Sequence, residues 1–165
     1  MDYKISVVIR TFNEQKHLGE VLESLKNQTY KNFEIIIVDS ESTDKTLEIA
    51  KKYDTKIVNI KKDDFDYSYA SNIGVKNSSG DIVCFLSGHS VPAQNNYLFE
   101  TNKIFQNEQV GACYGDVIAL EDGSIYEKLY NSLGVIKNKI KKNNCELILE
   151  NDFHKGMLSC SNASI

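Results

Sequence analysis

The chain has 165 residues, and its 19 Lys and Arg against 23 Asp and Glu leave a formal net charge of −4. That length fits a single domain, and 41% hydrophobic with 25% charged residues is the composition of an ordinary globular protein. The length and the composition argue against a fibrous repeat or a disordered chain. A mildly acidic chain also lacks the basic stripe of a general nucleic-acid binder, so we expect no nucleic-acid partner.

The cysteines and the N-terminus indicate the compartment. Four cysteines lie far apart and form no Cys-x-x-Cys pair, which is typical of free thiols in a reducing cytosol: Cys84, Cys113, Cys145 and Cys160. The chain starts on a strand-like segment without a secretory signal, and no apolar run approaches the roughly 20 residues of a spanning helix. We therefore expect a cytoplasmic protein, with at most peripheral contact at the inner face of a membrane. Lysines within 137–142 fit a solvated helix face, with contact to an anionic surface as the alternative.

The first part of the chain alternates β-branched runs with amphipathic segments. Residues 5–9 predict a strand buried on both faces, and residues 33–39 predict a second strand of the same kind. Between them, apolar residues at i, i+3, i+4 and i+7 predict a helix with the buried stripe Leu18, Val21, Leu22 and Leu25. We expect Asn13 to be the N-cap of this helix, with Glu14 near its positive end.

The alternation continues along the chain. A polar loop at 40–44 leads into a helix that we expect to reach Tyr53, and residues 56–60 predict a third strand. The remaining predicted elements are a helix at 69–77, a strand at 81–86, a helix from Pro92 to about Gln106, strands within 110–120 and a helix at 125–142. This order predicts an α/β fold, a mostly parallel sheet with helices on both faces.

In such a sheet, ligands bind beyond the carboxyl ends of the strands. The polar residues expected there are Thr11, Asn13, Glu14, Asp39, Ser40, Ser42, Ser87, Gly88, His89 and Ser90. Asp39 can accept hydrogen bonds from a base or a ribose, or it can simply cap a turn. No Gly-x-Gly-x-x-Gly and no P-loop motif is present, which argues against a dinucleotide dehydrogenase and a P-loop NTPase. The residues alone indicate a nucleotide-type ligand.

Several segments carry a resemblance when they are taken together in order. They are Ser6-Val7-Val8-Ile9-Arg10-Thr11-Phe12-Asn13-Glu14, the stretch 22–30, the stretch 33–44 with Asp39-Ser40-Glu41-Ser42, Ala70-Ser71-Asn72-Ile73-Gly74, and the stretch 80–86. Over about residues 4–92 the chain resembles the N-terminal half of family 2 glycosyltransferases. The resemblance implies a GT-A fold and an inverting transfer from a nucleotide-diphosphate sugar to a polysaccharide or glycolipid, that is, a glycan or lipid-linked acceptor.

The same resemblance implies the roles of individual residues. It implies a single domain over 1–165, with the nucleotide-sugar-binding part at about 1–92 and the start of the acceptor part at about 93–165. Thr11, Phe12, Asn13 and Glu14 would line the nucleoside pocket, Asp39 would contact the base, and Ser42 and Asn72 would lie near the ribose and the diphosphate. Helix packing is the alternative for Asn72.

The sequence departs from the family at the metal triplet. Relatives usually place Asp-x-Asp after the fourth strand to hold a divalent cation, whereas this chain has Ser87-Gly88-His89. Mg²⁺ and Mn²⁺ favour oxygen ligands, and carboxylates supply the balancing charge. This replacement puts a Mn²⁺ or Mg²⁺ cofactor in doubt. We expect His89 to be a metal ligand or an imidazolium donor to phosphate, with a purely structural histidine as the alternative.

The catalytic base is the second departure. Inversion needs a carboxylate to take the proton of the acceptor hydroxyl, and relatives supply it downstream of a segment that resembles Ser161-Asn162-Ala163-Ser164. We expect the base beyond Ile165, with Asp116 as a secondary candidate, so that the chain would be an incomplete catalytic domain with little turnover. The alternative is a non-catalytic glycosyltransferase-like module that binds a nucleotide or a partner. A nucleotidyltransferase is a third reading, against which the missing Gly-rich phosphate loop counts.

Overall fold

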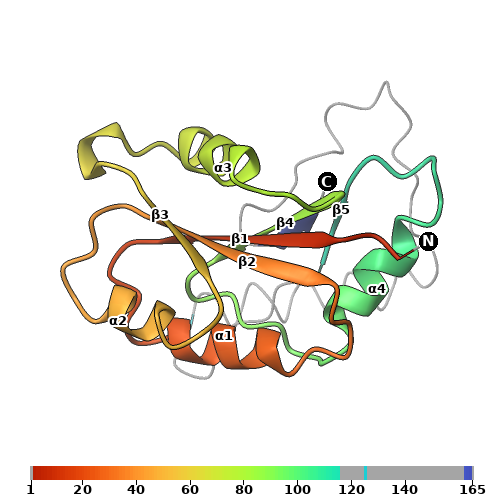
Figure 1. The fold of residues 1–165 in the computed structure, drawn as a ribbon, viewed down its shortest axis with the longest axis horizontal. Coiled ribbons are helices and arrows are strands. Elements are labelled where there is room, and N and C mark those ends of the chain that lie inside the picture. The colour runs from red at the N-terminus through yellow and green to blue at the C-terminus, as the bar shows by residue number, and fades with distance from the viewer. Residues whose placement is uncertain (1, 116–124, 126–161, 165) are drawn as a thin grey trace. The chain divides into compact units, whose positions relative to one another are not determined.

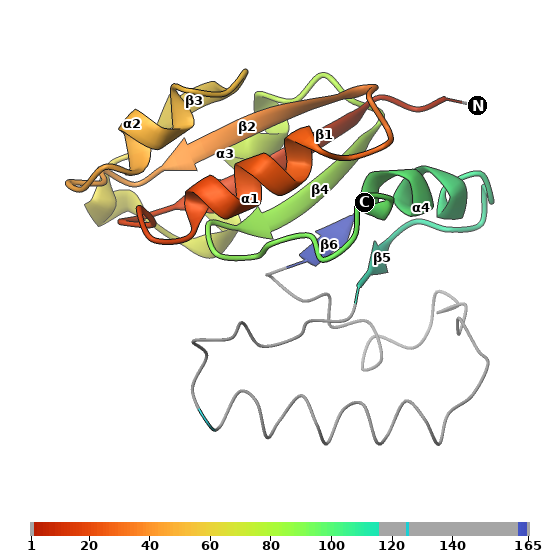
Figure 2. The same ribbon diagram turned by 90° about the horizontal axis from the view of Figure 1, so that it is seen from below.

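The computed structural model of the chain describes residues 2–115, 125 and 162–164. The chain divides into two compact units, and nearly all of the described residues belong to the one made of Met1–Tyr114 and Leu158–Ile165. In this unit a six-stranded sheet has the strand order β3-β2-β1-β4-β6-β5, and helices lie on both of its faces (Figures 1 and 2). The predicted α/β fold with a mostly parallel sheet is confirmed. A single domain over 1–165 stays a prediction.

The strands are β1 Ile5–Thr11, β2 Phe33–Asp39, β3 Lys56–Asn59, β4 Ile82–Ser87, β5 Cys113–Tyr114 and β6 Asn162–Ser164. β1 pairs in parallel with β2 on one side and with β4 on the other, and β2 pairs in parallel with β3. β6 is antiparallel to both β4 and β5. Every residue of β1 is buried, as expected for a strand that has neighbours on both edges and helices over both faces.

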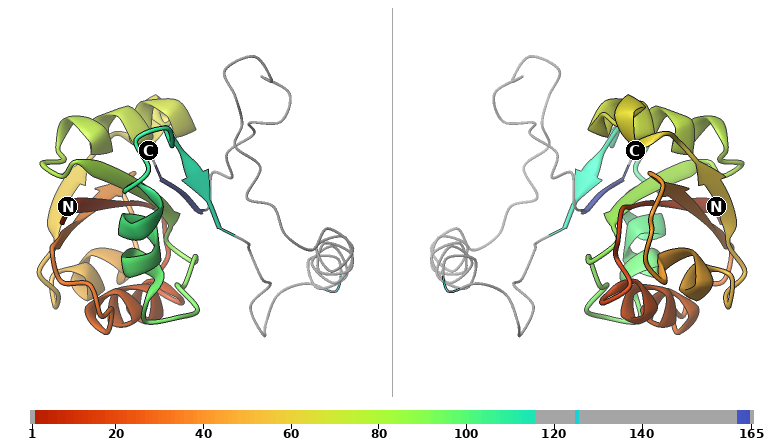
Figure 3. Two further views of the ribbon diagram at one scale, coloured as in Figure 1. Left: turned by 90° about the vertical axis from the view of Figure 1, so that its right-hand side faces the viewer. Right: turned by 90° about the vertical axis from the view of Figure 1, so that its left-hand side faces the viewer.

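The helices are α1 Leu18–Lys26, α2 Thr46–Ala50, α3 Tyr67–Lys76 and α4 Tyr97–Ile104, with a short 3₁₀ turn, η1, at Lys62–Asp64. α3 lies on one side of the sheet, and α1 and α2 lie on the other (Figure 3). Within the described part of the chain, none of these helices has the length and apolar character needed to span a membrane.

The core forms two layers because side chains on a strand alternate between faces. On one face, Val7 and Ile9 of β1 belong to the layer that includes the predicted stripe of α1, all of it fully buried: Leu18, Val21, Leu22 and Leu25. On the other face, Val8 packs with Val38 of β2 and Ala70 of α3. The stripe predicted from the sequence is therefore confirmed.

Two predicted helix starts are wrong. α1 begins at Leu18, and Asn13 is not its N-cap, because Asn13 has a left-handed backbone with φ of 55° and lies in the preceding loop. α4 begins at Tyr97, so Pro92 lies in a loop before it. The buried side chain of Gln28 decides this second boundary: its Oε1 accepts from the Leu98 N–H at 3.0 Å, and its Nε2 donates to a carbonyl of the loop.

Two other helix boundaries differ less from the predicted ones. α2 ends at Ala50, short of Tyr53, because the N–H groups of Lys52 and Tyr53 bond three residues back and tighten the chain into a turn. α3 begins at Tyr67, two residues before the predicted start. The Asp66 side chain caps it by accepting from the N–H groups of the next turn.

The remaining predictions have different outcomes. The short strand β6 was not predicted. Cys84 and Cys113 are free thiols, and burial raises the pKa of the Cys84 thiol to about 12. Several predictions lie outside the described residues: the strand residues 116–120, nearly all of the helix at 125–142, the lysine cluster, Asp116, Cys145 and Cys160.

Candidate functional site

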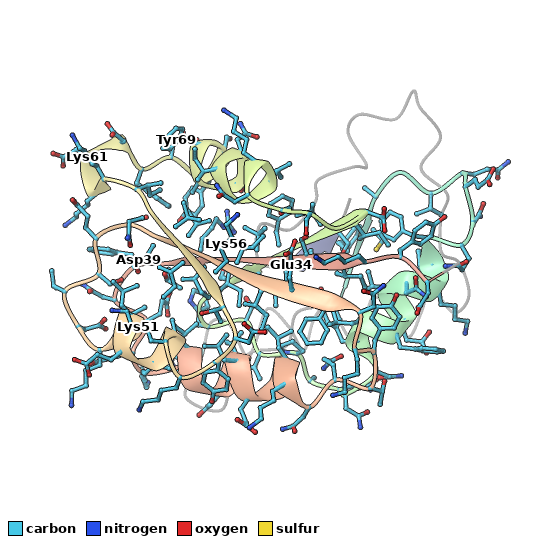
Figure 4. The ribbon with its side chains drawn as sticks, viewed as in Figure 1. Glu34, Asp39, Lys51, Lys56, Lys61 and Tyr69 are labelled. Atoms are coloured by element: carbon cyan, nitrogen blue, oxygen red, sulfur yellow. The ribbon has the colours of Figure 1, made fainter. Side chains whose placement is uncertain are left out.

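Asp39, at the carboxyl end of β2, is the centre of the candidate site (Figure 4). The Thr11 hydroxyl at the end of β1 donates to Asp39 Oδ1 at 2.8 Å. The Ser42 hydroxyl donates to the same oxygen at 2.6 Å, and the Ser42 N–H donates to Oδ2 at 2.8 Å. Asp39 is completely buried. Its carboxylate therefore holds the loop after β2 against the end of β1, and direct contact with a base stays a prediction.

Further hydrogen bonds join the loop after β1 to the loop after β2. The Asn13 N–H donates to Ser42 Oγ at 2.9 Å, and Asn13 Oδ1 accepts from the Thr43 N–H at 2.8 Å. The Glu14 N–H donates to Thr46 Oγ1 at 2.8 Å. We call the two joined loops, residues 11–15 and 40–46, the rim. The structure thus brings the predicted residues Thr11, Asn13, Glu14, Asp39 and Ser42 together.

Asp44 is a rim residue that the sequence analysis did not single out. Its carboxylate accepts from the N–H groups of Gln15 at 3.1 Å and Thr46 at 2.9 Å, and from the Thr46 hydroxyl. Burial acts to raise the pKa of Asp44, but these hydrogen bonds outweigh it and lower the pKa. Asp44 is therefore held as a carboxylate that fixes the rim. Its position just before the predicted helix was the available signal, since Asp often bonds to N–H groups at helix starts.

The loop after β4 reaches the same rim. The Gly88 N–H donates to the Arg10 carbonyl at 3.1 Å, and His89 Nδ1 lies 2.9 Å from Glu14 Oε1. A Cβ atom on Gly88 would lie 2.5 Å from Glu14 Cγ, so only glycine allows this approach. Ser87 is the last residue of β4. The carboxyl ends of the neighbouring strands β2, β1 and β4 thus carry one connected set of polar side chains.

Phe12 and Asn72 lie at the edges of this set. The Phe12 ring is 40% exposed, and Lys62 Nζ of η1 lies 4.8 Å from the ring centroid. Lys62 was missed by the sequence analysis, because nothing in the chain around it predicts that η1 approaches the first loop. Asn72 is an exposed residue of α3. The hydrogen bonds of the rim do not extend to it, so its place near a diphosphate stays a prediction.

Arg10 is a third residue that the sequence analysis missed. It is only 8% exposed, and its guanidinium carbon lies 5.3 Å from the centroid of the Tyr67 ring. Tyr67 in turn meets Phe65 edge to face, with ring centroids 5.2 Å apart. Tyr69 follows in the first turn of α3 (Figure 4). A charged residue inside a β-branched strand was the available signal, since Arg is rarely buried without a specific contact.

The described donors do not fit a divalent cation by themselves. Among residues 2–115, 125 and 162–164 there is no group of three or more His, Cys, Asp or Glu side chains placed to hold one. Ser87 and His89 bring no carboxylate, and Glu14 Oε1 is already paired with His89. A hard cation such as Mg²⁺ requires several oxygen ligands in fixed geometry. The prediction that His89 ligates a metal gains no support from this donor set.

Comparisons with curated proteins identify relatives of this chain. It is 30% identical over 154 residues to the glycosyltransferase GlyA of Streptococcus pneumoniae serotype 4, with 84% of this chain and 22% of GlyA covered. It is 41% identical over 98 residues to a protein of Methanococcus voltae, with 55% of this chain and 30% of the relative covered. That relative is described as dolichyl N-acetyl-alpha-D-glucosaminyl phosphate 3-beta-D-2,3-diacetamido-2,3-dideoxy-beta-D-glucuronosyltransferase. The chain therefore spans less than a third of the length of either relative.

Comparisons of structure and of family agree with these relatives. The mannosyltransferase PcManGT of Pyrobaculum calidifontis, solved with GDP-Man and Mn²⁺, superposes with a TM-score of 0.63 at 22% identity, over 68% of this chain and 35% of that one. TarS 1-349 of S. aureus, solved with UDP-GlcNAc, gives the same TM-score and identity over 74% of this chain and 36% of that one. These likenesses show the GT-A fold. A sequence profile of the family "Glycosyl transferase family 2" matches residues 6–161, and the chain belongs to that family.

Proposed function

We propose that this chain is the nucleotide-sugar-binding part of an inverting glycosyltransferase, which transfers a sugar from a nucleotide-diphosphate sugar to a glycan or lipid-linked acceptor. One observation carries the proposal: the carboxyl ends of β2, β1 and β4 present connected polar side chains at one edge of the sheet. Ligands of open α/β sheets bind at this edge. PcManGT and TarS, which share the fold, were solved with GDP-Man and UDP-GlcNAc.

The described residues support separate roles at this edge. The exposed Phe12 ring offers a flat apolar surface for a base, and Lys62 above it adds positive charge. The rim, whose conformation the Asp39 carboxylate fixes, lies at the same edge of the sheet, and we place the ribose over it. The Glu14–His89 pair lies beside Ser87, at the position that the family resemblance assigns to the diphosphate. Thus the nucleoside would lie over the rim and the diphosphate toward β4.

The reaction is a substitution at the anomeric carbon of the donor sugar. The acceptor hydroxyl attacks that carbon from the face opposite the nucleoside diphosphate and forms the new C–O bond. The old C–O bond breaks, and the diphosphate leaves with its electron pair. A carboxylate takes the proton of the acceptor hydroxyl. Asp116 is the candidate within this chain and lies outside the described residues, so no described residue is assigned as the base.

The acceptor and the place of reaction belong to the same proposal. The printed name of the relative from Methanococcus voltae describes transfer to a dolichyl-linked sugar phosphate. A lipid-linked acceptor would bring the protein to a membrane surface, and we propose the cytoplasmic face, where nucleotide sugars would be available to it. No step of the reaction is derived through a divalent cation, because the described donors do not fit one.

A thermal-shift titration tests the donor site. The chain is heated with UDP, GDP, dTDP or CDP, each with and without Mn²⁺, and a nucleotide present at about 100 times its Kd should stabilise the native state by about 2.7 kcal/mol. We expect one nucleotide to raise Tm. Asp39→Asn, which keeps the shape of the side chain but loses an acceptor for the Ser42 N–H, should abolish that shift. Asp54→Asn is the matched control, because Asp54 is exposed in the turn before β3.

One observation favours a second candidate function. Ser87-Gly88-His89 lacks carboxylates at the position of the family's metal triplet, as a non-catalytic nucleotide-binding or partner-binding module would. An assay of sugar transfer distinguishes the two functions. Nucleotide binding without transfer, measured with the full-length protein and a lipid-linked acceptor, would favour the module, as would the absence of a thermal shift with all four nucleotides.

A further inference from the structure

We propose that the exposed rings of Phe65 and Tyr67 form a platform that binds a neutral saccharide ring, and that this ring belongs to the acceptor glycan at a distance from the reacting hydroxyl. The assignment to an acceptor rests on the proposed function, whereas the platform itself is recognised from its own side chains. Neither the family resemblance nor the names of the similar proteins assign a role to these two residues.

The two rings lie open to solvent where the chain passes from η1 into α3. Phe65 is 38% exposed and Tyr67 is 63% exposed. Their centroids are 5.2 Å apart, and the ring planes make an angle of 69°. Within the part of the chain that the structure describes, the Tyr67 hydroxyl has no hydrogen-bond partner. Water solvates aromatic faces poorly, so two exposed rings in contact indicate a surface that a ligand covers.

Contacts with the rest of the fold hold the platform in place. The Lys62 N–H donates to Glu41 Oε2 at 3.1 Å, which ties η1 to the loop after β2, and the Phe65 N–H donates to the Lys62 carbonyl at 3.1 Å. The Arg10 guanidinium carbon lies 5.3 Å from the centroid of the Tyr67 ring. A surface that is ordered before binding loses less conformational freedom when a ligand arrives. The platform is therefore preformed.

The charges around the platform indicate the class of ligand. Residues 61–67 carry two lysines and three aspartates: Lys61, Lys62, Asp63, Asp64 and Asp66. Anionic membranes and nucleic acids attract segments with an excess of basic residues, and this segment has none. Asp66 caps α3, whereas Asp63 and Asp64 are exposed and have no side-chain partner among the described residues. Two carboxylates thus remain to accept hydrogen bonds from an uncharged ligand.

A saccharide ring matches both the aromatic rings and the carboxylates. One face of a pyranose carries C–H groups, which pack against the electron-rich face of an aromatic ring, and the hydroxyl groups lie around its edge. The Tyr67 hydroxyl can donate to these groups or accept from them, and carboxylates accept from them. A lipid tail would instead cover the carboxylates of Asp63 and Asp64 without offering a donor, which costs free energy. The platform therefore fits a neutral saccharide.

The place of the platform assigns this saccharide to the acceptor. Lys62 of η1 lies over Phe12, so the platform adjoins the nucleoside end of the proposed donor site. The proposed function puts the diphosphate, and with it the single donor sugar, toward β4. A sugar ring on the platform is thus a separate one, and a long acceptor glycan can reach both places. Because binding of a remote part of a substrate can accelerate its reaction, shortening the acceptor should slow transfer.

Binding to immobilised glycans tests the proposal without any nucleotide. The panel holds linear neutral hexasaccharides of glucose, mannose, galactose and N-acetylglucosamine, with the hexasaccharide of galacturonic acid as the anionic comparison. We expect the full chain to bind at least one neutral hexasaccharide and to bind the anionic one more weakly. Phe65→Ala and Tyr67→Ala should each weaken that binding by about tenfold, because aromatic anchors contribute much of the free energy of binding. Tyr67→Phe keeps the ring and should weaken it less.

Tyr69→Ala is the matched control. Tyr69 is 43% exposed in the same turn of α3 (Figure 4), but a side chain two positions further along a helix points to nearly the opposite side. We expect this variant to bind glycans as the original chain does. If neither alanine variant of the platform folds, the double variant Asp63→Ala/Asp64→Ala takes their place and should weaken the same binding.

Three results would overturn the platform. They are no binding to any neutral hexasaccharide, an equal loss in Tyr69→Ala, and binding to phosphatidylserine vesicles, in place of glycans, that Phe65→Ala abolishes. The nucleotide titration tests the donor site separately. Nucleotide binding without glycan binding would refute this inference alone, whereas glycan binding without nucleotide binding would keep the platform and refute the proposed function.

Discussion

His89 Nδ1 lies 2.9 Å from Glu14 Oε1, and this contact joins the loop after β4 to the loop after β1. A carboxylate that accepts from one nitrogen of an imidazole fixes the orientation of the ring and decides which nitrogen faces a ligand. With Nδ1 directed at Glu14, the His89 ring is held in one orientation beside the rim. The pair thus converts a single loop histidine into an oriented group of the site.

Gly88→Ala should separate this pair. The new Cβ would lie 2.5 Å from Cγ and 2.9 Å from Cβ of Glu14, so the Glu14 side chain must move away from His89. We expect the affinity for the nucleoside diphosphate to fall by about tenfold, roughly the value of one charged hydrogen bond. Titration calorimetry measures this loss. Because Cβ of Glu14 is attached to the backbone, one of the two loops must shift as well, and Tm should fall; a lower Tm with unaltered affinity would contradict the prediction.

Asn13 should show two separable contributions to the rim. Its backbone is left-handed, with φ of 55°, and its Oδ1 accepts from the Thr43 N–H at 2.8 Å. Asn13→Gly keeps the backbone conformation and loses the acceptor, which should lower the free energy of unfolding by about 1 kcal/mol. Asn13→Ala loses the acceptor and also disfavours the left-handed backbone. We expect it to lower the free energy of unfolding by about 2 kcal/mol, since a left-handed backbone costs residues such as alanine about 1 kcal/mol. Urea denaturation would contradict this if both variants lost the same stability.

Gly74→Ala should destabilise the contact between α3 and β1. A Cβ on Gly74 would overlap Cγ1 of Val8, which is fully buried in the middle of the sheet. Overpacking of this kind costs about 1–3 kcal/mol, which should lower the urea midpoint. Gly111→Ala is the matched control, because a Cβ there has no neighbour within 4 Å. Equal midpoints for the two variants would show that α3 can shift without cost.

Glu34 should contribute stability that depends on pH. Burial acts to raise the pKa of Glu34, but hydrogen bonds from Ser6 and Ser79, together with the Lys4 ammonium 3.4 Å away, outweigh it and lower the pKa to about 2. A carboxyl group whose pKa is lowered on folding stabilises the protein above its unfolded pKa, near 4.5. That stability, on the order of 2 kcal/mol, is lost as pH falls toward 2.

Glu34→Gln tests this pH dependence. Glu34 is the second residue of β2, at the end remote from the rim (Figure 4), so nucleotide affinity should remain unchanged. We expect the variant to be less stable than the original chain at pH 7 and to lose less stability between pH 5 and pH 2. Urea midpoints across this range provide the measurement. If the midpoints of the two proteins fell equally between pH 5 and pH 2, the pH-dependent contribution of Glu34 would be refuted.

Local pattern was sufficient to find the central strands. β2 was predicted at 33–39 and forms at Phe33–Asp39, whereas β1 was predicted at 5–9 and continues to Thr11, because its polar last residues stay paired with β2. The buried stripe of α1 was predicted residue by residue. The start of α4 was predicted wrongly, because Gln28, seventy residues before Leu98, bonds to Leu98 and decides where that helix begins.

The candidate site was also predicted only in part: its residues were found from the sequence, and their contacts were not. The residues after β1, β2 and β4 were predicted together, because parallel strands that share a sheet bring their carboxyl ends to one edge. Their hydrogen bonds were not predicted: the burial of Asp39 between Thr11 and Ser42 depends on the conformation of two loops at once. Lys62 was missed because η1 reaches Phe12 only in the folded chain.

The sequence by itself determined the α/β class, the order of strands and helices along the chain, and the family. These depend on periodicity and on motifs that are local in the chain. Only the tertiary structure decided that Arg10 stands beside Ser87, that Glu14 meets His89, and that Asn13 belongs to the rim and not to α1. The physical reason is that such contacts join residues from about thirty to more than seventy positions apart, and their geometry follows from strand register and loop conformation, which no local pattern specifies.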